Sequence, residues 1–424
     1  MPVEVATVYR PRRPRESPLY TLVDECYDEV KGSWEERFER RYGHWRGTIE
    51  DAVFAFLNCG IYDHGFARVG CPECHAEYLV AFSCQRRGFC PSCAAKRGAL
   101  FGAFLAEEVL EDVGHCLWTF TIPKMLRPYF RHHRHLLGEL SKAAWEVVRE
   151  LMATAVGDPG LRPGMVSVVH THGDMLGWHP HVHAIASRGG WAADGSFTPV
   201  PFVDATGAEQ LFGHQVITLL RDEGLLTEER IELLLSWRHS GFSAHNAVRI
   251  AAGDAASIER LARYLLRSPV ALERMRLDAP AGEVHYQAKE ASGRGPRKHT
   301  FEPVELLARL LQHVPEPRLH QVRYYGYYSN VARARRAPDT EQAASASLPE
   351  PTAAERKQLR RSWAQLIRRI YEVDPLVCRE CGAEMRILAF ILDSAVIRKI
   401  LHHLDKKRSL PARAPPNERA TTVS

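Results

Sequence analysis

The stretch HPHVHAIASRG (residues 179–189) places histidines at every second position, namely His179, His181 and His183. Alternate residues of a β-strand point to the same face, so on a strand these imidazoles would lie together. A lone histidine is ordinarily a hydrogen-bonded or surface side chain. Two imidazoles on one strand, joined by a polar ligand from a neighbouring strand, can instead hold a divalent ion with open coordination positions. On ligand grounds alone imidazole suits Zn, Cu, Fe or Ni.

The surrounding sequence indicates the fold class. Two other β-rich runs precede the histidines, at residues 115–124 and 164–173, with a helical pattern between them. Helical patterns return over 207–240 and 255–267, and another strand is expected at 282–290. The order β-α-β-β-α with long helical insertions predicts an α+β protein, in which helices flank an antiparallel sheet.

The chain of 424 residues is long enough for two or three domains and shows no internal repeat. A Pro/Ala/Ser-rich stretch indicates one linker. The expected division is a flexible basic arm (1–17), a helical and zinc-binding, DNA-binding domain (18–112), a core (113–337), the linker (338–353), a helix with a CxxC pair (354–404) and a disordered tail (405–424).

The charge distribution is more informative than the total charge. The formal net charge is only +5, which does not by itself indicate a nucleic-acid partner. Arginines cluster at several places, however, and planar guanidinium groups suit bidentate contacts with phosphate. No apolar run is long enough to span a membrane, and the N-terminus lacks a signal-peptide core. We therefore expect a cytoplasmic, nucleoid-associated protein of bacterial type, whose cysteines are metal ligands or catalytic groups rather than disulfides.

A dense group of cysteines precedes the core. Cys71 and Cys74 form one CxxC pair, and Cys90 and Cys93 form a second pair after fifteen intervening residues. This spacing is typical of a structural Zn²⁺ site with four thiolate ligands and no open position. A redox or coincidental origin is the alternative. Further potential ligands could share a second ion, replace a ligand or pack as buried side chains; they are Cys84, which we add as a candidate zinc ligand, Cys59, His64 and His75.

Basic residues surround the second pair, and their charge could face a phosphate backbone: Arg86, Arg87, Lys96 and Arg97. A zinc module that only supports its neighbour would look similar. Near the C-terminus, Cys378 and Cys381 form a single CxxC pair. As half a zinc site, this pair could be completed by a histidine such as His402 or His403, by another chain, or not at all.

Tyr264 lies on an amphipathic helix with Arg263 and Arg267 nearby, and both arginines are candidate DNA contacts. A helical tyrosine between arginines can attack a phosphodiester, although a structural role is the ordinary explanation. Downstream, RYYGYYSNVARARR (323–336) combines tyrosines and arginines, a plan common in single-strand binding. Its candidate DNA contacts are Arg323, Tyr324, Tyr325, Tyr327 and Arg333. An aromatic strand packed in the core, with an exposed basic end, is the alternative.

Taken together, these motifs resemble the rolling-circle transposases of the insertion sequence 91 family, which belong to the HUH (His-hydrophobic-His) endonucleases. The resemblance runs in order from about residue 10 to 390 through CPECHAEYLVAFSCQRRGFCPSC, FTIPKMLRPYF, HPHVHAI, LARYLLRSPVALERM and HVPEPRLHQVRYYGYYSN. It implies an HUH-endonuclease core, a zinc-binding domain before it, and structural Zn²⁺ with catalytic Mg²⁺ or Mn²⁺.

The resemblance also implies residue roles. His181 and His183 become the HUH ligands of the catalytic ion, and Tyr264 becomes the nucleophile that cuts single-stranded DNA at an element end. Cleavage would leave a 5′-phosphotyrosine and a free 3′-hydroxyl, and the strand would later be transferred. Relatives tend to carry a polar third ligand on the preceding β-rich run. His170 is our candidate for it, and His172 is the second choice because it lies on the same side by alternation.

One departure from the family concerns the nucleophile. Many members carry two tyrosines separated by three residues, but here Arg260 stands four positions before Tyr264. The site therefore resembles the single-tyrosine common-region elements, which would require sequential reuse of the tyrosine or a second subunit in a homodimer.

Expected partners are single-stranded and double-stranded DNA of the element ends and target, with host replication proteins, and no membrane. The alternatives are a plasmid replication initiator or conjugative relaxase with the same chemistry, and a non-catalytic, zinc-dependent DNA-binding regulator. Both HUH histidines and the tyrosine are present, which argues against the regulator.

Overall fold

The computed structural model describes residues 13–201, 203–288, 298–336, 378 and 380–409. The chain divides into two compact units. The larger unit comprises residues 15–57 and the described part of 85–372, and the smaller comprises 13–14, 58–84 and the described part of 373–424. Most of the expected arm, the linker at 338–353, the helix expected after it and most of the tail lie outside the described residues.

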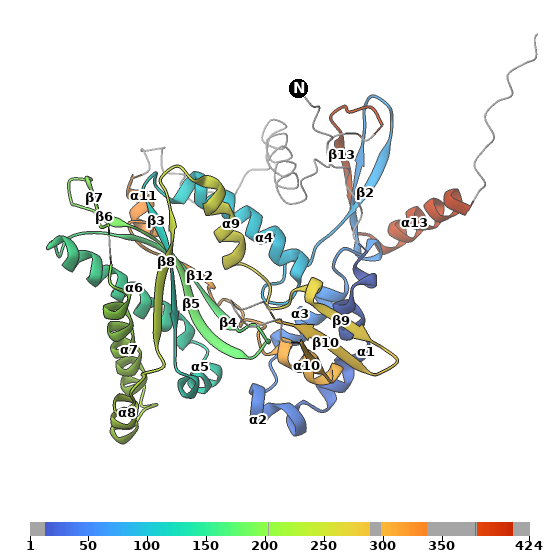
Figure 1. Cartoon of the computed structure of the whole chain (residues 1–424). Helices are drawn as coiled ribbons and strands as arrows, with labels where there is room; N and C mark the ends of the chain where they lie inside the picture. Colours follow the sequence, from blue (N-terminus) through green and yellow to red (C-terminus); the bar gives the residue numbers. More distant parts are fainter. Residues whose placement is uncertain (1–12, 202, 289–297, 337–377, 379, 410–424) are drawn as a thin grey trace, which may run out of the picture. The chain divides into compact units, whose positions relative to one another are not determined.

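A five-stranded antiparallel sheet, in the order β12-β4-β5-β3-β8, forms the centre of the larger unit (Figure 1). Its strands are β3 (His115–Thr121), β4 (Gly164–His172), β5 (Trp178–Ser187), β8 (Ser243–Ile250) and β12 (Val322–Gly326). The sheet confirms the α+β class. Strand β8 was not predicted, because at this edge only Ala244 and Ile250 are buried and the apolar alternation is weak.

Helices cover both faces of this sheet. On one face α6 (Leu136–Val156) and α7 (Ala205–Asp222) pack on the strands, and on the other face α4 (Pro91–Phe104) and α9 (Ala255–Leu265) do so. Side chains alternate along β5, so that Val182 and Ala184 join the α6–α7 core while Ile185 joins the α4–α9 core. The odd-numbered histidines of β5 consequently face α9.

The other elements of the larger unit surround this core. They include α1 (Pro18–Gly32), η2 (Trp34–Phe38), α2 (Glu39–Tyr42), α3 (Gly47–Leu57), η4 (Leu105–Val109), η5 (Lys124–Leu126), α5 (Arg127–His132), β6 (Gly189–Trp191), β7 (Phe197–Pro199), α8 (Glu228–Leu235), η6 (Leu272–Arg274), β9 (Met275–Asp278), β10 (Glu283–Gln287), β11 (Lys298–Phe301), α10 (Pro303–Leu311) and α11 (Asn330–Arg336). Strands β11, β10 and β9 form a second sheet in that order. Among the described helices, none has the length and apolar character needed to cross a membrane.

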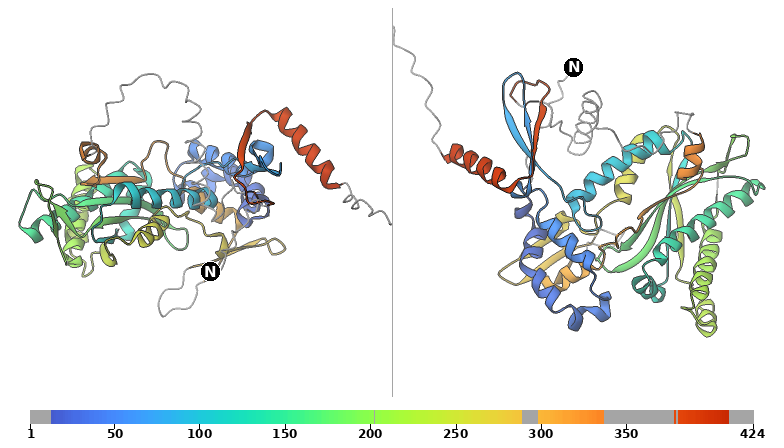
Figure 2. Two further views of the ribbon diagram at one scale, coloured as in Figure 1. Left: turned by 90° about the horizontal axis from the view of Figure 1, so that it is seen from above. Right: turned by 180° about the vertical axis from the view of Figure 1, so that it is seen from behind.

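The smaller unit joins segments from distant parts of the sequence. Its sheet has the order β13-β1-β2, in which the β1–β2 hairpin lies beside a strand from the C-terminal region (Figure 2). The elements are η3 (Tyr62–His64), β1 (Phe66–Gly70), β2 (Glu77–Ala81), β13 (Arg386–Ile391) and α13 (Ser394–Ser409). Both strand pairs are antiparallel.

Candidate active site and cysteine groups

The register of the central sheet brings three histidines together. His170 of β4 lies directly opposite His181 of β5, and His183 follows His181 on the same face. The possible ligand nitrogens of these three residues lie within 4.8 Å of one another, and all three side chains are buried. His170, the third ligand chosen from the sequence, thus lies beside His181 and His183. His172 does not join the group, because a register irregularity separates it from His170.

Hydrogen bonds orient the rings of this group. The Nδ1–H of His181 donates to the carbonyl oxygen of His179 over 2.7 Å, which leaves a lone pair on Nε2. The Nδ1 of His183 lies 3.0 Å from the hydroxyl of Thr119, and its Nε2 lies 3.1 Å from the Nε2 of His181. When Thr119 accepts a hydrogen bond from the Nδ1–H of His183, the Nε2 lone pairs of His181 and His183 face each other. A divalent cation stabilises this arrangement.

His170 completes the group from the neighbouring strand. Its Nε2–H donates to the carbonyl oxygen of Leu265 over 2.6 Å, and its Nδ1 has no hydrogen-bond partner among the described residues. Burial lowers the pKa of His170 to about 4 and lowers those of His181 and His183 well below the ordinary value, so the three rings are neutral at pH 7. Neutral imidazoles with aligned lone pairs fit a divalent metal ion.

Tyr264 reaches the histidine group from helix α9. Its hydroxyl lies 3.5 Å from the Nε2 of His183, and the two rings meet edge to face with centroids 5.1 Å apart. The guanidinium carbon of Arg267 lies 4.4 Å from the centre of the tyrosine ring. The chain segment that follows Tyr264 is fixed by the bond from His170 to Leu265. The tyrosine hydroxyl and three potential ligands therefore occupy one site.

Close helix packing holds α9 in this position (Figure 1). Gly98 and Gly102 lie one turn apart on α4 and face Arg263 and Glu259 of α9. A Cβ atom at Gly102 would lie 3.0 Å from the Cα of Glu259, and one at Gly98 would lie 3.1 Å from the Cα of Arg263. The backbones of the two helices thus approach at a distance that only glycine permits without a shift.

An arginine-lined cavity adjoins the histidine group. Arg86, Arg87, Arg97 and Arg267 line it together with His170, and no Asp or Glu is among its described lining residues. The Arg87 guanidinium donates to the carbonyl oxygen of Leu319 over 2.6 Å, and that of Arg97 donates to the carbonyl oxygen of Gln85 over 2.8 Å. Burial lowers the pKa of Arg87. Positive charge without a lining carboxylate makes the cavity suitable for an anion.

The remaining predicted DNA contacts do not line this cavity. Arg263 lies 3.8 Å from Glu259 on the half-exposed side of α9, outside this cavity. Tyr325 stacks on Trp145, and Tyr327 stacks on Trp191 with ring centroids 3.7 Å apart.

The other members of this segment also contact protein groups. Arg333 lies over the ring of Tyr324, with its guanidinium carbon 5.2 Å from the ring centre. The Arg323 guanidinium lies against Gly138 of α6. The tyrosine rings of this segment therefore already contact protein groups, as expected for the packed aromatic strand that was the alternative.

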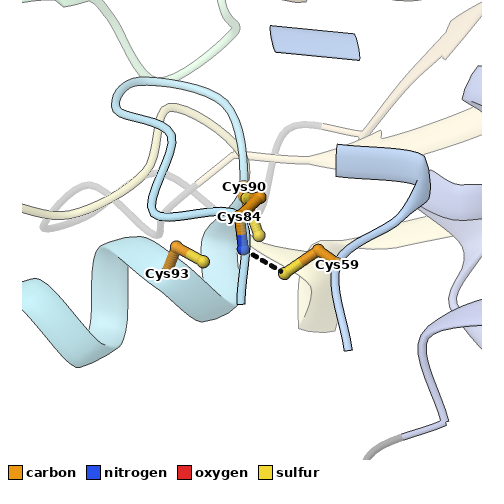
Figure 3. Close-up of side chains that lie close together, drawn as sticks. All are labelled: Cys59, Cys84, Cys90 and Cys93. Atoms are coloured by element: carbon orange, nitrogen blue, oxygen red, sulfur yellow. Dashed lines mark hydrogen bonds between the residues drawn. The ribbon is translucent and has the colours of Figure 1, made fainter. Parts of the chain in front are cut away.

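The cysteines form two groups, and neither is the group of four that the spacing in the sequence predicted. Cys59, Cys84, Cys90 and Cys93 form one group, in which the four sulfur atoms lie within 4.8 Å of one another (Figure 3). Cys71, Cys74, Cys378 and Cys381 form the other. The structure thus does not bring Cys71 and Cys74 together with Cys90 and Cys93. It does bring Cys84 into a group, as proposed, and it completes the C-terminal pair with cysteines rather than with His402 or His403.

One residue of the site was missed from the sequence. Thr119 is paired with His183 in the β3–β5 ladder and contacts its Nδ1. A threonine in a β-rich run carries no signal of its own. Only the strand order and register place it beside the histidine.

Comparisons with known proteins agree on one class. Residues 164–336 match a family described as "Putative transposase", and residues 30–122 match one described as "Transposase zinc-binding domain". The transposase for insertion sequence element IS801 of Pseudomonas savastanoi pv. phaseolicola is 26% identical over 415 residues, which is 92% of each chain. The "Putative transposase y4qJ" of Sinorhizobium fredii (strain NBRC 101917 / NGR234) is 26% identical over 306 residues, 66% of this chain and 75% of its own. No solved structure matches.

Proposed function

We infer that the chain is a transposase of the insertion sequence 91 family, and on that premise we propose that it nicks single-stranded DNA at the ends of its element and transfers the cut strand, in rolling-circle transposition. The observation that carries this proposal is the meeting of Tyr264 with the three histidines, since its hydroxyl lies 3.5 Å from His183. The same site would serve a replication initiator or relaxase, but the match to a transposase zinc-binding domain favours transposition.

His170, His181 and His183 would hold the divalent ion, which we take as Mg²⁺ or Mn²⁺. When bound, such an ion polarises a phosphodiester and stabilises the charge that develops on it. The protein's own part is to keep the three rings neutral and oriented. Burial and the bonds to His179, Thr119 and Leu265 do this.

Tyr264 is the proposed nucleophile. Its Oη would form a bond to phosphorus while the bond from phosphorus to the 3′ oxygen breaks, so the 5′ end becomes a phosphotyrosine ester. The phenolic proton leaves to solvent, and the 3′ oxygen takes up a proton to become a free hydroxyl. Arg267 holds the tyrosine ring by its cation–π contact and extends toward the neighbouring cavity.

The arginine-lined cavity would hold the DNA backbone beside the scissile bond. Arg86, Arg87 and Arg97 come from the turn before α4 and from α4 itself, and Arg267 comes from the end of α9. Because the cavity also reaches His170, a phosphate bound there would lie next to the reacting one. The proposed partners are therefore single-stranded element ends and, after cleavage, target DNA in the bacterial nucleoid.

The test uses single-stranded oligonucleotides from the DNA that flanks the coding sequence, incubated with the full chain and Mn²⁺ or Mg²⁺. We expect a protein–DNA adduct that survives denaturing electrophoresis and that Tyr264→Phe eliminates. Tyr327→Phe is the matched control and keeps the adduct, since that ring lies between Trp191 and Arg336.

Two results would contradict the proposal. An adduct that persists in Tyr264→Phe would mean that another residue is the nucleophile. Binding of the oligonucleotides without metal and without any adduct would instead favour a DNA-binding regulator.

A further inference from the structure

The second cysteine group joins two CxxC turns that are far apart in sequence. The Sγ atoms of Cys71 and Cys381 lie 3.5 Å apart, and those of Cys74 and Cys378 lie 3.3 Å apart. All four sulfur atoms lie within 4.8 Å of one another. Four thiolates about 2.3 Å from a tetrahedral Zn²⁺ would be about 3.8 Å apart, so the group is close to the size that this ion requires.

The two turns have the same backbone geometry. In the first, the N–H of Cys71 donates to the carbonyl of Ala76 and the N–H of His75 donates to the carbonyl of Cys71. In the second, the N–H of Cys378 donates to the carbonyl of Ala383, and the N–H of Gly382 donates to that of Cys378.

The left-handed residue also occupies the same position in both turns. His75 has a φ of 61° and Gly382 a φ of 74°, each directly after the second cysteine. In each turn the first cysteine is buried and the second exposed. The two segments are therefore equivalent halves of one site.

Strand pairing holds these halves in register. The β1–β2 hairpin carries the first turn between its strands, and β13 follows the second turn and pairs with the outer edge of β1 (Figure 2). A three-stranded antiparallel sheet with two such turns at one end has the plan of a zinc ribbon. Few large side chains are buried among the described residues of this unit; they include Phe66, Val69, Met385 and Ile387. A sheet of this size gains much of its stability from a metal ion.

We propose that Cys71, Cys74, Cys378 and Cys381 bind one Zn²⁺ ion in a split zinc ribbon, half from the N-terminal and half from the C-terminal part of the chain. The matched zinc-binding domain ends at residue 122, so it does not include the second half. The ion links residues 304 and 310 positions apart in sequence. The ribbon can consequently form only after the C-terminal cysteines have been synthesised, and the ion holds the C-terminal segment on the N-terminal hairpin.

The test measures zinc, and its readout does not depend on DNA cleavage. Full-length protein carrying Cys378→Ser and Cys381→Ser should contain one Zn²⁺ ion per chain fewer than the wild type by elemental analysis. Cys71→Ser with Cys74→Ser should lose the same single ion. Cys26→Ser is the control and should lose none, because Cys26 lies on α1 outside both described cysteine groups.

A second variant distinguishes the loss of a zinc ligand from misfolding of the protein. Cys381→His keeps a zinc ligand, so the zinc content should return to the wild-type value, while Co²⁺ substituted at the site should show the altered absorption of three thiolates and one imidazole. An unchanged zinc content in the Cys378/Cys381 variant would overturn the proposal. So would an unchanged cobalt spectrum in Cys381→His.

Discussion

At the scale of single residues, the candidate active site depends on which nitrogen of each histidine is free. His181 and His170 use one nitrogen each on a backbone carbonyl, and His183 directs Nδ1 toward the hydroxyl of Thr119. The two carbonyl oxygens fix the tautomers of His170 and His181, and the possible ligand nitrogens of the three rings lie within 4.8 Å of one another. Thr119 would contribute to the geometry of the candidate ligands through its contact with His183.

The Thr119→Val variant isolates this contribution, because valine keeps the β-branched shape but lacks the hydroxyl. We expect the affinity for Mn²⁺, measured by titration calorimetry, to fall roughly 10–100-fold since His183 loses its orienting partner. Thr121→Val is the matched control on the same strand; its hydroxyl pairs with Ser243 rather than with a histidine. Equal Mn²⁺ affinities in the two variants would show that Thr119 does not orient the ligand.

At the scale of elements, the site depends on how helix α9 lies on the sheet. The strands provide the histidines, whereas the tyrosine reaches them only because α9 lies close against α4 at Gly98 and Gly102. Sequence periodicity indicated that Tyr264 is on a helix. The approach of that helix to β5 follows from two small residues more than a hundred and fifty positions earlier in the chain.

Replacing Gly102 by alanine should move α9, because the new Cβ would meet the backbone of Glu259 at 3.0 Å. We expect a cost of about 1–3 kcal/mol in the free energy of unfolding, measured with urea. Misplacement of the tyrosine should also slow adduct formation about tenfold. Gly32→Ala is the control at a helix end where a Cβ meets nothing within 4 Å. An adduct rate in Gly102→Ala equal to that control would show that the packing does not position Tyr264.

At the scale of the whole molecule, the chain contains two chemically different kinds of candidate metal site. The three histidines would be neutral ligands that leave coordination positions open, whereas each cysteine group would offer four thiolates. Thiolates hold Zn²⁺ tightly in a closed tetrahedral site, while an open imidazole site exchanges its ion more readily.

Brief dialysis against EDTA should therefore separate the two kinds of site. We expect adduct formation to stop and to return on addition of Mn²⁺ alone, while the zinc content measured by elemental analysis stays constant. Loss of zinc in parallel with activity, with recovery only when Zn²⁺ is restored, would contradict this assignment.

The sequence by itself determined what depends on local periodicity. Alternation along a strand places His181 and His183 on one face, and helical spacing places Tyr264 among arginines. The order of elements indicated the α+β class. These features depend on the direction in which each side chain leaves the backbone. That direction is set by the local backbone conformation, which residues close in sequence determine.

The tertiary structure decided which distant groups meet. The β4–β5 register brings His170 rather than His172 to the pair, and strand order adds Thr119. The nearest CxxC pairs in sequence do not share a group, because β13 pairs with β1 and carries Cys378 and Cys381 to Cys71 and Cys74. Spacing along the chain limits which cysteines can form a turn, but it does not select the partner of that turn. That choice is made by strand pairing between segments about three hundred residues apart.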